Sequence, residues 1–182
     1  MTTRDRILDA ALACFGRHGF RHTSVERIAE AAGVSRPTVY QHVGGKEGAF
    51  RAVGARMLDA ALADAEAAAA GAGPLAERLH GVLAAKFRLV VGNADGEFRG
   101  ELLAEAATVA GDLLAAFHER LAAILTGLLA PVATDPPARD TALLLLDAIT
   151  GIERSDAPAA VLAVRLRQLV DLTIRGTERS LT

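Results

Sequence analysis

Apolar residues recur along the N-terminal part of this chain at the three- and four-residue spacing of an amphipathic helix. The first stripe of this kind consists of Ile7, Ala10, Ala11, Cys14 and Phe15. Cys14 belongs to the stripe, and free cysteines are usually buried, so we expect it to be a small core residue. Gly19 follows the stripe and suits the left-handed position that ends many helices. The pattern therefore predicts one helix that ends before Gly19.

A second, shorter helix is predicted directly after the first. The segment Thr23-Ser24-Val25-Glu26 fits a capping box, in which the Thr23 hydroxyl caps the helix and the Glu26 side chain reaches back. The inward face of this helix would be formed by Val25, Ile28, Ala29 and Ala32. Gly33 ends the helix about ten residues after it began.

A third helix is predicted after a very short turn. Val34 and Ser35 complete the turn, Ser35 is a natural N-cap, and Pro37 falls in the first turn, where a missing N–H costs little. Val39 and Val43 lie four residues apart and can both face inward. The side chains left largely outside are those of Arg36, Pro37, Thr38, Tyr40, Gln41 and His42.

The remainder of the chain also has a helical pattern, which glycine- and proline-rich breaks divide into segments. A fourth helix is predicted from Lys46-Glu47 to about residue 70. Five further segments follow at 75–91, 97–109, 112–130, 137–153 and 158–178. The sequence thus predicts an all-α fold of about nine helices, with an N-terminal three-helix domain at 1–47 and a second helical domain at 48–182.

Two short helices joined by Gly-Val-Ser are typical of a helix-turn-helix, here at about residues 24–43, whose second helix can enter the major groove of DNA. Arg36 can donate to guanine or phosphate, and the Pro37 ring can contact a thymine methyl group. Phosphate oxygens can accept hydrogen bonds from Thr38, Tyr40 and His42. Lys46 combines its charge with the positive end of the next helix, an arrangement that binds phosphate.

Composition indicates a folded, helical protein, and the distribution of charge says more about DNA binding than the net charge, which on its own argues against it. The chain is 51% hydrophobic, 23% charged and 4% aromatic, which excludes disorder and favours helices. Its net charge of −2 is unevenly distributed, with seven basic and five acidic residues in 1–50 and an acidic excess in 51–182. A single cysteine excludes an intramolecular disulfide and a cysteine cluster for zinc. We find no secretory leader and no membrane span, and expect a soluble, cytoplasmic protein.

Residues 4–53 resemble the DNA-binding domain of TetR-family transcriptional regulators. The resemblance covers about the first quarter of the chain and rests on the ordered motifs Ile7-Leu8, Ala10-Ala11, Phe15, Gly19-Phe20, Thr23-Ser24-Val25, Ile28-Ala29, Ala32-Gly33-Val34-Ser35-Arg36-Pro37-Thr38-Val39-Tyr40-Gln41-His42 and Lys46-Glu47. It implies that the residues from Arg36 to His42 lie on a recognition helix, that Lys46 holds phosphate, and that Thr23 or Ser24 touches phosphate. The DNA-binding set is therefore Thr23, Ser24, Arg36, Pro37, Thr38, Tyr40, Gln41, His42 and Lys46.

Two residues depart from the family's pattern. Val43 replaces a bulky aromatic residue, which would thin the packing of the third helix on the fourth. Gly45 replaces a polar capping residue, so we expect a looser junction there. Neither departure touches the residues that face DNA.

For the rest of the chain, the resemblance implies a ligand cavity and a homodimer formed by the last two helices. The candidate ligand residues are Met57, Leu83, Phe87, Leu103, Phe117, His118 and Leu121, and few charges interrupt their faces, which favours an apolar effector. The candidate dimer residues are Leu145, Ile149, Leu162, Leu166, Leu169, Val170 and Thr173. The alternative is that these apolar stripes only fill the core of the monomer.

The resulting prediction is a sequence-specific regulator, a repressor released from a palindromic operator in double-stranded DNA by a small effector. One alternative is a helical dimeric interaction protein without DNA binding. A small helical enzyme is a further alternative, but no metal-ligand spacing, phosphate-binding glycine loop or catalytic triad accompanies the carboxylates of Glu101 and Glu105. We expect neither a cofactor nor a bound metal.

Overall fold

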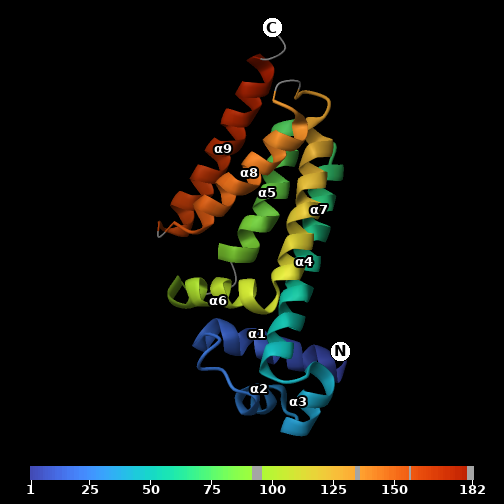
Figure 1. Cartoon of the computed structure of the whole chain (residues 1–182), viewed down its shortest axis with the longest axis vertical. Coiled ribbons are helices and arrows are strands. Elements are labelled where there is room, and N and C mark those ends of the chain that lie inside the picture. Colours follow the sequence, from blue (N-terminus) through green and yellow to red (C-terminus); the bar gives the residue numbers. More distant parts are fainter. Residues whose placement is uncertain (92–95, 134–135, 156, 180–182) are drawn as a thin grey trace. The chain divides into compact units, whose positions relative to one another are not determined.

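A computed structural model describes residues 1–91, 96–133, 136–155 and 157–179, and these parts of the chain form helices without any strand (Figure 1). The helices are α1 (Thr3–His18), α2 (Val25–Ala32), α3 (Arg36–Val43), α4 (Lys46–Ala70), α5 (Leu75–Val91), α6 (Gly96–Val109), α7 (Gly111–Leu129), α8 (Ala138–Glu153) and α9 (Ala159–Arg179). The predicted all-α fold is confirmed, and the predicted bounds of α5 to α9 agree with the structure to within one residue.

The chain divides into two compact units, which we call the head and the body. The head comprises Met1–Asp59 and Asn93–Leu114, of which 96–114 are described in the second range, and the body comprises the rest. The head thus extends beyond residue 47, the predicted end of the DNA-binding domain, and includes α6. Two helices, α4 and α7, begin in the head and continue into the body.

The core of the head is formed by the inward faces of α1, α2 and α3 and by the first turns of α4. Its fully buried side chains include Ile7, Leu8, Ile28 and Val39. Phe15 and Phe20 each place their rings 5.1 Å from the ring of Phe50, edge to face, an arrangement that stabilises aromatic clusters beyond simple burial. Cys14 is also buried here, as predicted.

The prediction that Thr23 caps α2 is wrong. Ser24, not Thr23, is the N-cap, and its hydroxyl accepts a hydrogen bond from the Arg27 backbone N–H at 3.3 Å. Thr23 is buried, and its hydroxyl donates to the carbonyl oxygens of Gly19 and Cys14, at 2.7 and 3.2 Å. The Thr23 side chain therefore fixes the path of the chain into α2. It points into the protein, whereas a phosphate contact would need the hydroxyl at the surface.

The junction between α3 and α4 is close-packed, so the expectation of a looser junction is wrong. Gly45 is buried with a φ of 105°, a conformation that side chains disfavour, and a Cβ there would lie 3.0 Å from Cε1 of Tyr40. At Gly48, one turn further on, a Cβ would lie only 1.8 Å from the carbonyl oxygen of Val43. Val43 itself is buried in the head core. Small residues thus allow the first turn of α4 to approach the end of α3.

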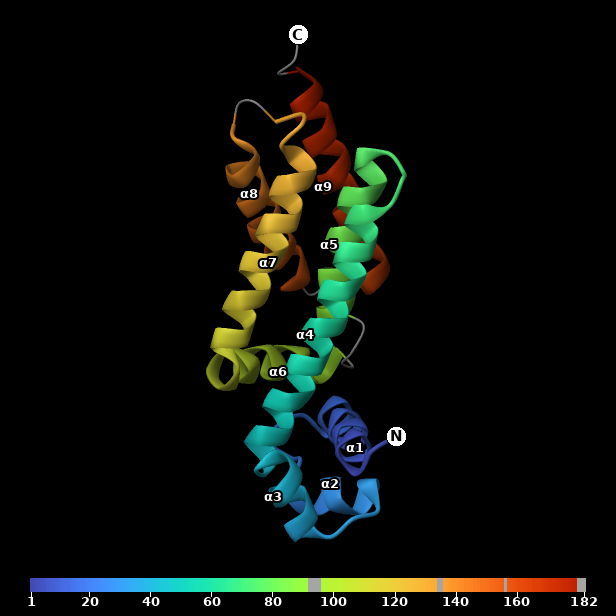
Figure 2. The ribbon, with the colours of Figure 1, turned by 90° about the vertical axis from the view of Figure 1, so that its right-hand side faces the viewer.

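In the body, α5, α8 and α9 pack on one another, side by side in both views (Figures 1 and 2). Their buried faces supply apolar side chains such as Leu83, Ile149 and Leu162, and α7 adds Leu121 and Leu125. The removal of these apolar side chains from water is the main contribution to the stability of such a bundle. Among the described residues, no helix has the length and apolar character to span a membrane.

One ion pair lies inside this apolar core. The Lys86 ammonium group is 2.5 Å from Oε2 of Glu153 and 3.2 Å from the Thr150 hydroxyl. Burial raises the pKa of Glu153, and the nearby Lys86 charge opposes that rise. The pair joins α5 to α8, and such buried pairs are costly to break because one charge is left without a partner.

Candidate nucleic-acid interface

The α2–turn–α3 segment has the geometry of a helix-turn-helix for local reasons. Gly33 ends α2 in the left-handed conformation, with a φ of 64°. Two residues later the Ser35 hydroxyl accepts a hydrogen bond from the Thr38 backbone N–H and begins α3. Val39 is fully buried, which anchors α3 on α1 and α2. The opposite face of α3 is consequently turned to solvent.

That outer face brings together most of the predicted DNA-binding side chains. Arg36, Pro37, Gln41 and His42 are exposed, and Tyr40 keeps 51% of its surface accessible. Such exposure contributes little to packing, because the aromatic ring of a tyrosine is normally buried in the core. Thr38 is half-buried, with its hydroxyl 2.8 Å from that of Ser35. The face thus presents one cation and several hydrogen-bonding groups on a helix narrow enough for the major groove.

Lys46 lies where the sequence places it, at the first residue of α4. Its ammonium group donates to the Arg21 carbonyl oxygen at 3.3 Å and lies 4.2 Å from the centre of the Phe20 ring. These contacts orient the side chain along the α1–α2 connection and leave ammonium hydrogens for a further acceptor. The positive end of α4 adds to the charge, so an anion at this position would meet two favourable fields.

One residue of this surface was missed by the sequence reasoning. Glu26 was interpreted only as part of a helix cap, yet its Oε1 lies 2.7 Å from Nη2 of Arg36. The two residues lie ten positions apart, on different helices, so neither helical periodicity nor motif spacing indicates the contact. The candidate interface therefore includes a carboxylate beside its principal cation.

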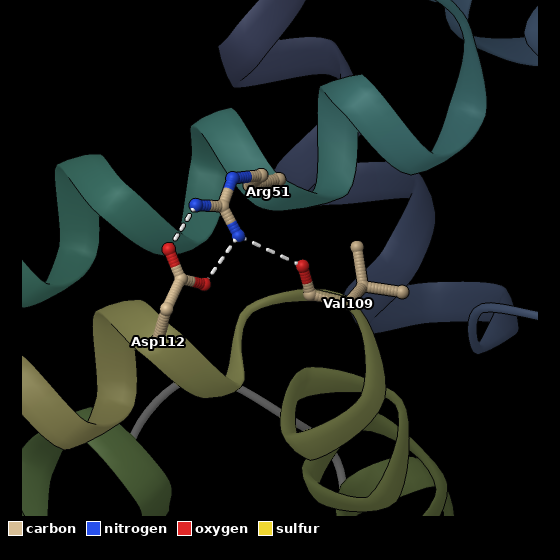
Figure 3. Close-up of polar contacts among 3 residues, drawn as sticks. All are labelled: Arg51, Val109 and Asp112. Carbon is tan, nitrogen blue, oxygen red and sulfur yellow. Dashed lines mark hydrogen bonds and ion pairs between the residues drawn. The ribbon is translucent and has the colours of Figure 1, made fainter.

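A second polar cluster of the head joins α4, α6 and α7 (Figure 3). The Arg51 guanidinium on α4 binds both carboxylate oxygens of Asp112, in the first turn of α7, and donates to the carbonyl oxygen of Val109 at the end of α6 at 2.9 Å. The hydrogen bonds from Arg51 lower the pKa of Asp112 to about 2. We call Arg51, Val109 and Asp112 the clamp, because one side chain joins three helices.

The predicted ligand residues are divided between the head and the body. Met57 packs against the core of the head, and Leu103 on α6 is exposed. The remaining five lie in the body, where Leu83, Phe87, Phe117 and Leu121 are buried and His118 is half-buried against Phe117. A hollow of about 330 Å³ lies instead in the head, lined by Arg21, Glu101, Ala104, Glu105 and Thr108, none of them predicted for a ligand. Within the described residues, no group of three or more His, Cys, Asp or Glu could hold a metal ion.

Most of the predicted dimer residues are part of the core of their own chain. Leu145, Ile149, Leu162, Leu166 and Val170 are at most 2% exposed. Leu169 and Thr173 are half-buried, and the Thr173 hydroxyl donates to the Leu169 carbonyl oxygen within α9. These five residues thus fill the core of their own chain, where α5, α8 and α9 cover them.

A different apolar face of the same two helices is exposed. It consists of Leu143, Leu144, Val161, Val164 and Leu172, with exposures from 39% to 67%. We call these five residues the outer face of α8 and α9. Large aliphatic side chains gathered on one pair of helices are typical of a surface that another molecule covers.

The N-terminal part of the chain is similar to known bacterial regulators. Residues 7–53 match the family model described as bacterial regulatory proteins, tetR family. The HTH-type transcriptional repressor ComR of Escherichia coli strain K12 is 44% identical over 64 residues, which cover 35% of this chain and 30% of ComR. The HTH-type transcriptional regulator TcmR of Streptomyces glaucescens is 36% identical over 99 residues, covering 54% and 42% of the two chains. The matched regions thus span less than half the length of these relatives.

Solved structures share the whole fold at low sequence identity. A transcriptional regulator from Rhodococcus sp. Rha1 is similar with a TM-score of 0.78 and 21% identity, covering 96% of this chain and 97% of that one. The fatty acid degradation regulator FadR from Bacillus halodurans is similar with a TM-score of 0.69 and 18% identity, covering 93% and 95%. At these identities the likeness establishes the fold alone.

Proposed function

We propose, from the premise that this chain belongs to the tetR family of bacterial regulatory proteins, that it is a sequence-specific DNA-binding transcriptional regulator. The observation that carries the proposal is the outer face of α3, the second helix of the helix-turn-helix. This face exposes Arg36, Tyr40, Gln41 and His42, while the inner residues of the motif are buried. Proteins of this family are regulators, and that membership excludes the alternative of a small helical enzyme.

The mode of action we propose is repression from a palindromic operator by a homodimer. Relatives named as repressors, such as ComR, support this direction of regulation. The outer face of α8 and α9 supports a two-fold dimer, in which the same patch is used by both subunits. Two heads related by a two-fold axis would meet half-sites roughly 34–36 Å apart, one turn of the DNA helix.

Selection of bound duplexes from a random pool tests the proposal directly. We expect a palindromic motif whose half-sites are spaced by one helical turn or a multiple of it. The alternative of an interaction protein without DNA binding predicts no enrichment and no salt-dependent shift of any duplex. A regulator would show both, because phosphate contacts release counterions on binding.

Lys46→Ala should weaken binding to every duplex alike. The Lys46 ammonium group, held between Arg21 and Phe20, is in our proposal a phosphate contact and reads no base. Its loss should reduce the slope of log affinity against log salt by about one unit. Affinity titrations at several salt concentrations measure this slope. If Lys46→Ala changed the preferred sequence while the slope stayed the same, Lys46 would have to contact bases instead.

We further propose that a small, mainly apolar effector binds the body and releases the DNA. A conformational change in the body can reach the head through two continuous helices, because α4 and α7 both run from the head into the body. Within the head, the clamp fastens the first turn of α7 to α4 (Figure 3). A shift of α7 would therefore be transmitted to the helix that follows α3. By linkage, the effector must bind free protein more tightly than DNA-bound protein, typically by about 5–150-fold.

The clamp should give the head a distinctive acid sensitivity. The pKa of Asp112 is lowered from 3.8 to about 2 by hydrogen bonds from Arg51. A carboxylate with a lowered pKa stabilises the fold fully above its unfolded value, and that stabilisation is lost as the pH falls towards 2. We expect the melting temperature of the wild type to fall more steeply between pH 4 and pH 2 than that of Asp112→Asn. Asp59→Asn removes the same charge from an exposed position on α4 and should behave like the wild type. Identical acid profiles for Asp112→Asn and the wild type would mean that the clamp does not stabilise the fold.

A further inference from the structure

Arg36, the cation at the start of α3, forms an ion pair with a residue of the neighbouring helix α2. Its Nη2 lies 2.7 Å from Oε1 of Glu26, and the two side chains remain 58% and 52% exposed. An ion pair this exposed contributes little to stability, because water screens it and two long side chains lose freedom. The pair nevertheless lies on the face that we propose to bind DNA, where a carboxylate is unexpected because phosphate repels it.

We propose, building on the proposed function, that Glu26 is a specificity-determining residue: it orients Arg36 towards a base edge and makes Arg36 a poorer phosphate contact. The proposal concerns how the head distinguishes its operator from other DNA. It requires no group beyond the two side chains and a guanine in the major groove.

The first part of the argument is geometric. An arginine side chain carries five N–H donors in one rigid plane. Donation from Nη2 to Glu26 restricts the rotation of that plane and leaves further donors for the O6 and N7 acceptors of guanine, which arginine contacts in pairs. Because the side chain is already oriented in the free protein, less conformational entropy is lost when it meets the base.

The second part is electrostatic. The Glu26 carboxylate offsets the charge that Arg36 would offer to a phosphate, and it repels phosphate oxygens nearby. Its own backbone N–H and the Ser24 hydroxyl, together with Arg36, hold the pKa of Glu26 below its usual value, so the group stays charged at neutral pH. Binding through phosphates alone is thereby penalised, whereas a guanine contact is kept. A residue that disfavours the wrong partner raises specificity without adding a contact to the right one.

Glu26→Gln provides the test, since glutamine keeps the size of the side chain and removes the charge. Binding of the full-length protein to the selected operator and to a scrambled duplex of equal length is measured by fluorescence anisotropy over a salt series. For Glu26→Gln we expect tighter binding to the scrambled duplex, with a salt slope steeper by up to about one unit. We also expect a several-fold loss of preference at one base pair, up to the roughly 5–150-fold that a bidentate arginine contact represents.

Glu30→Gln is the matched control, because Glu30 is exposed on the same helix and forms none of the ion pairs found among the described residues. It should leave base preference unchanged. Glu26→Asp keeps the charge and shortens the reach, so it should lose preference without a steeper salt slope. In an Arg36→Ala background, Glu26→Gln should have no further effect on preference.

Two results would overturn the inference. One is equal behaviour of Glu26→Gln and Glu30→Gln, which would indicate only a general effect of charge. The other is a loss of preference that persists in the Arg36→Ala background. A wild-type protein that binds operator and scrambled duplex equally would contradict the proposed function itself, whereas unchanged preference in a DNA-binding Glu26→Gln variant contradicts this inference alone.

Discussion

Glutamate in place of Leu144 or Val164 should convert the proposed dimer to a monomer and reduce affinity for the operator by roughly 10²–10⁴-fold. Both side chains belong to the outer face of α8 and α9 and are 66% and 56% exposed in the single chain. A charge there costs nothing in the monomer but would be buried without a partner in a dimer. Each head would then bind its half-site alone and would lose the gain in effective concentration that two linked heads provide. Sedimentation and operator titration measure the two effects.

The controls separate dissociation from unfolding. Ala123→Glu adds the same charge at an exposed position on α7 and should leave a dimer that binds operator normally. Leu166→Glu should unfold the protein rather than dissociate it, because Leu166 is only 2% exposed within its own chain. If Leu144→Glu and Val164→Glu both remained dimeric, the subunits would have to meet through another surface.

Gly48→Ala should destabilise the head by about 3 kcal/mol or more, since overpacking of this kind typically costs 1–3 kcal/mol and occasionally more. The added Cβ would lie 1.8 Å from the Val43 carbonyl oxygen, and a backbone atom cannot rotate away as a flexible side chain can. Either α3 shifts relative to α4 or the head loosens. In both cases the outer face of α3, which we propose to bind DNA, moves, so affinity for the operator should fall with the melting temperature.

Gly54→Ala is the matched control for this substitution. Gly54 lies on the same helix, and a Cβ there would meet nothing within 4 Å. Alanine is the better helix former by roughly 0.5–1 kcal/mol, so Gly54→Ala should raise the melting temperature slightly and leave DNA binding intact. Equal stability of the two variants would contradict the close approach of α4 to α3.

Periodicity and capping chemistry are sufficient to predict the helices and which side chains of α3 are exposed. Both depend on residues close in sequence, as the Ser35 cap and the buried Val39 illustrate. The error at Thr23 arose because two adjacent hydroxyl residues can each begin a helix. Only the tertiary packing, which directs the Thr23 hydroxyl to carbonyl groups at the end of α1, decides between them.

Surfaces formed by distant segments could not be predicted in the same way. Helix α9 has two apolar stripes, one with Leu162 and Leu166 and another with Val161 and Val164. The sequence analysis found only the first, and periodicity cannot tell which stripe the chain's own α5 and α8 cover. The clamp has the same origin, because Arg51 and Asp112 lie 61 residues apart. Their contact depends on the path of the intervening helices.

The burial of Cys14 has a practical consequence for measuring the dynamics of the head. It is the chain's single cysteine, it is 8% exposed, and burial raises the pKa of its thiol, so little of the reactive thiolate is present. An alkylating reagent reaches this sulfur when the packing around Cys14 in the head core opens. The rate of labelling therefore reports the free energy of local opening in one unit of the protein, with no background from the other.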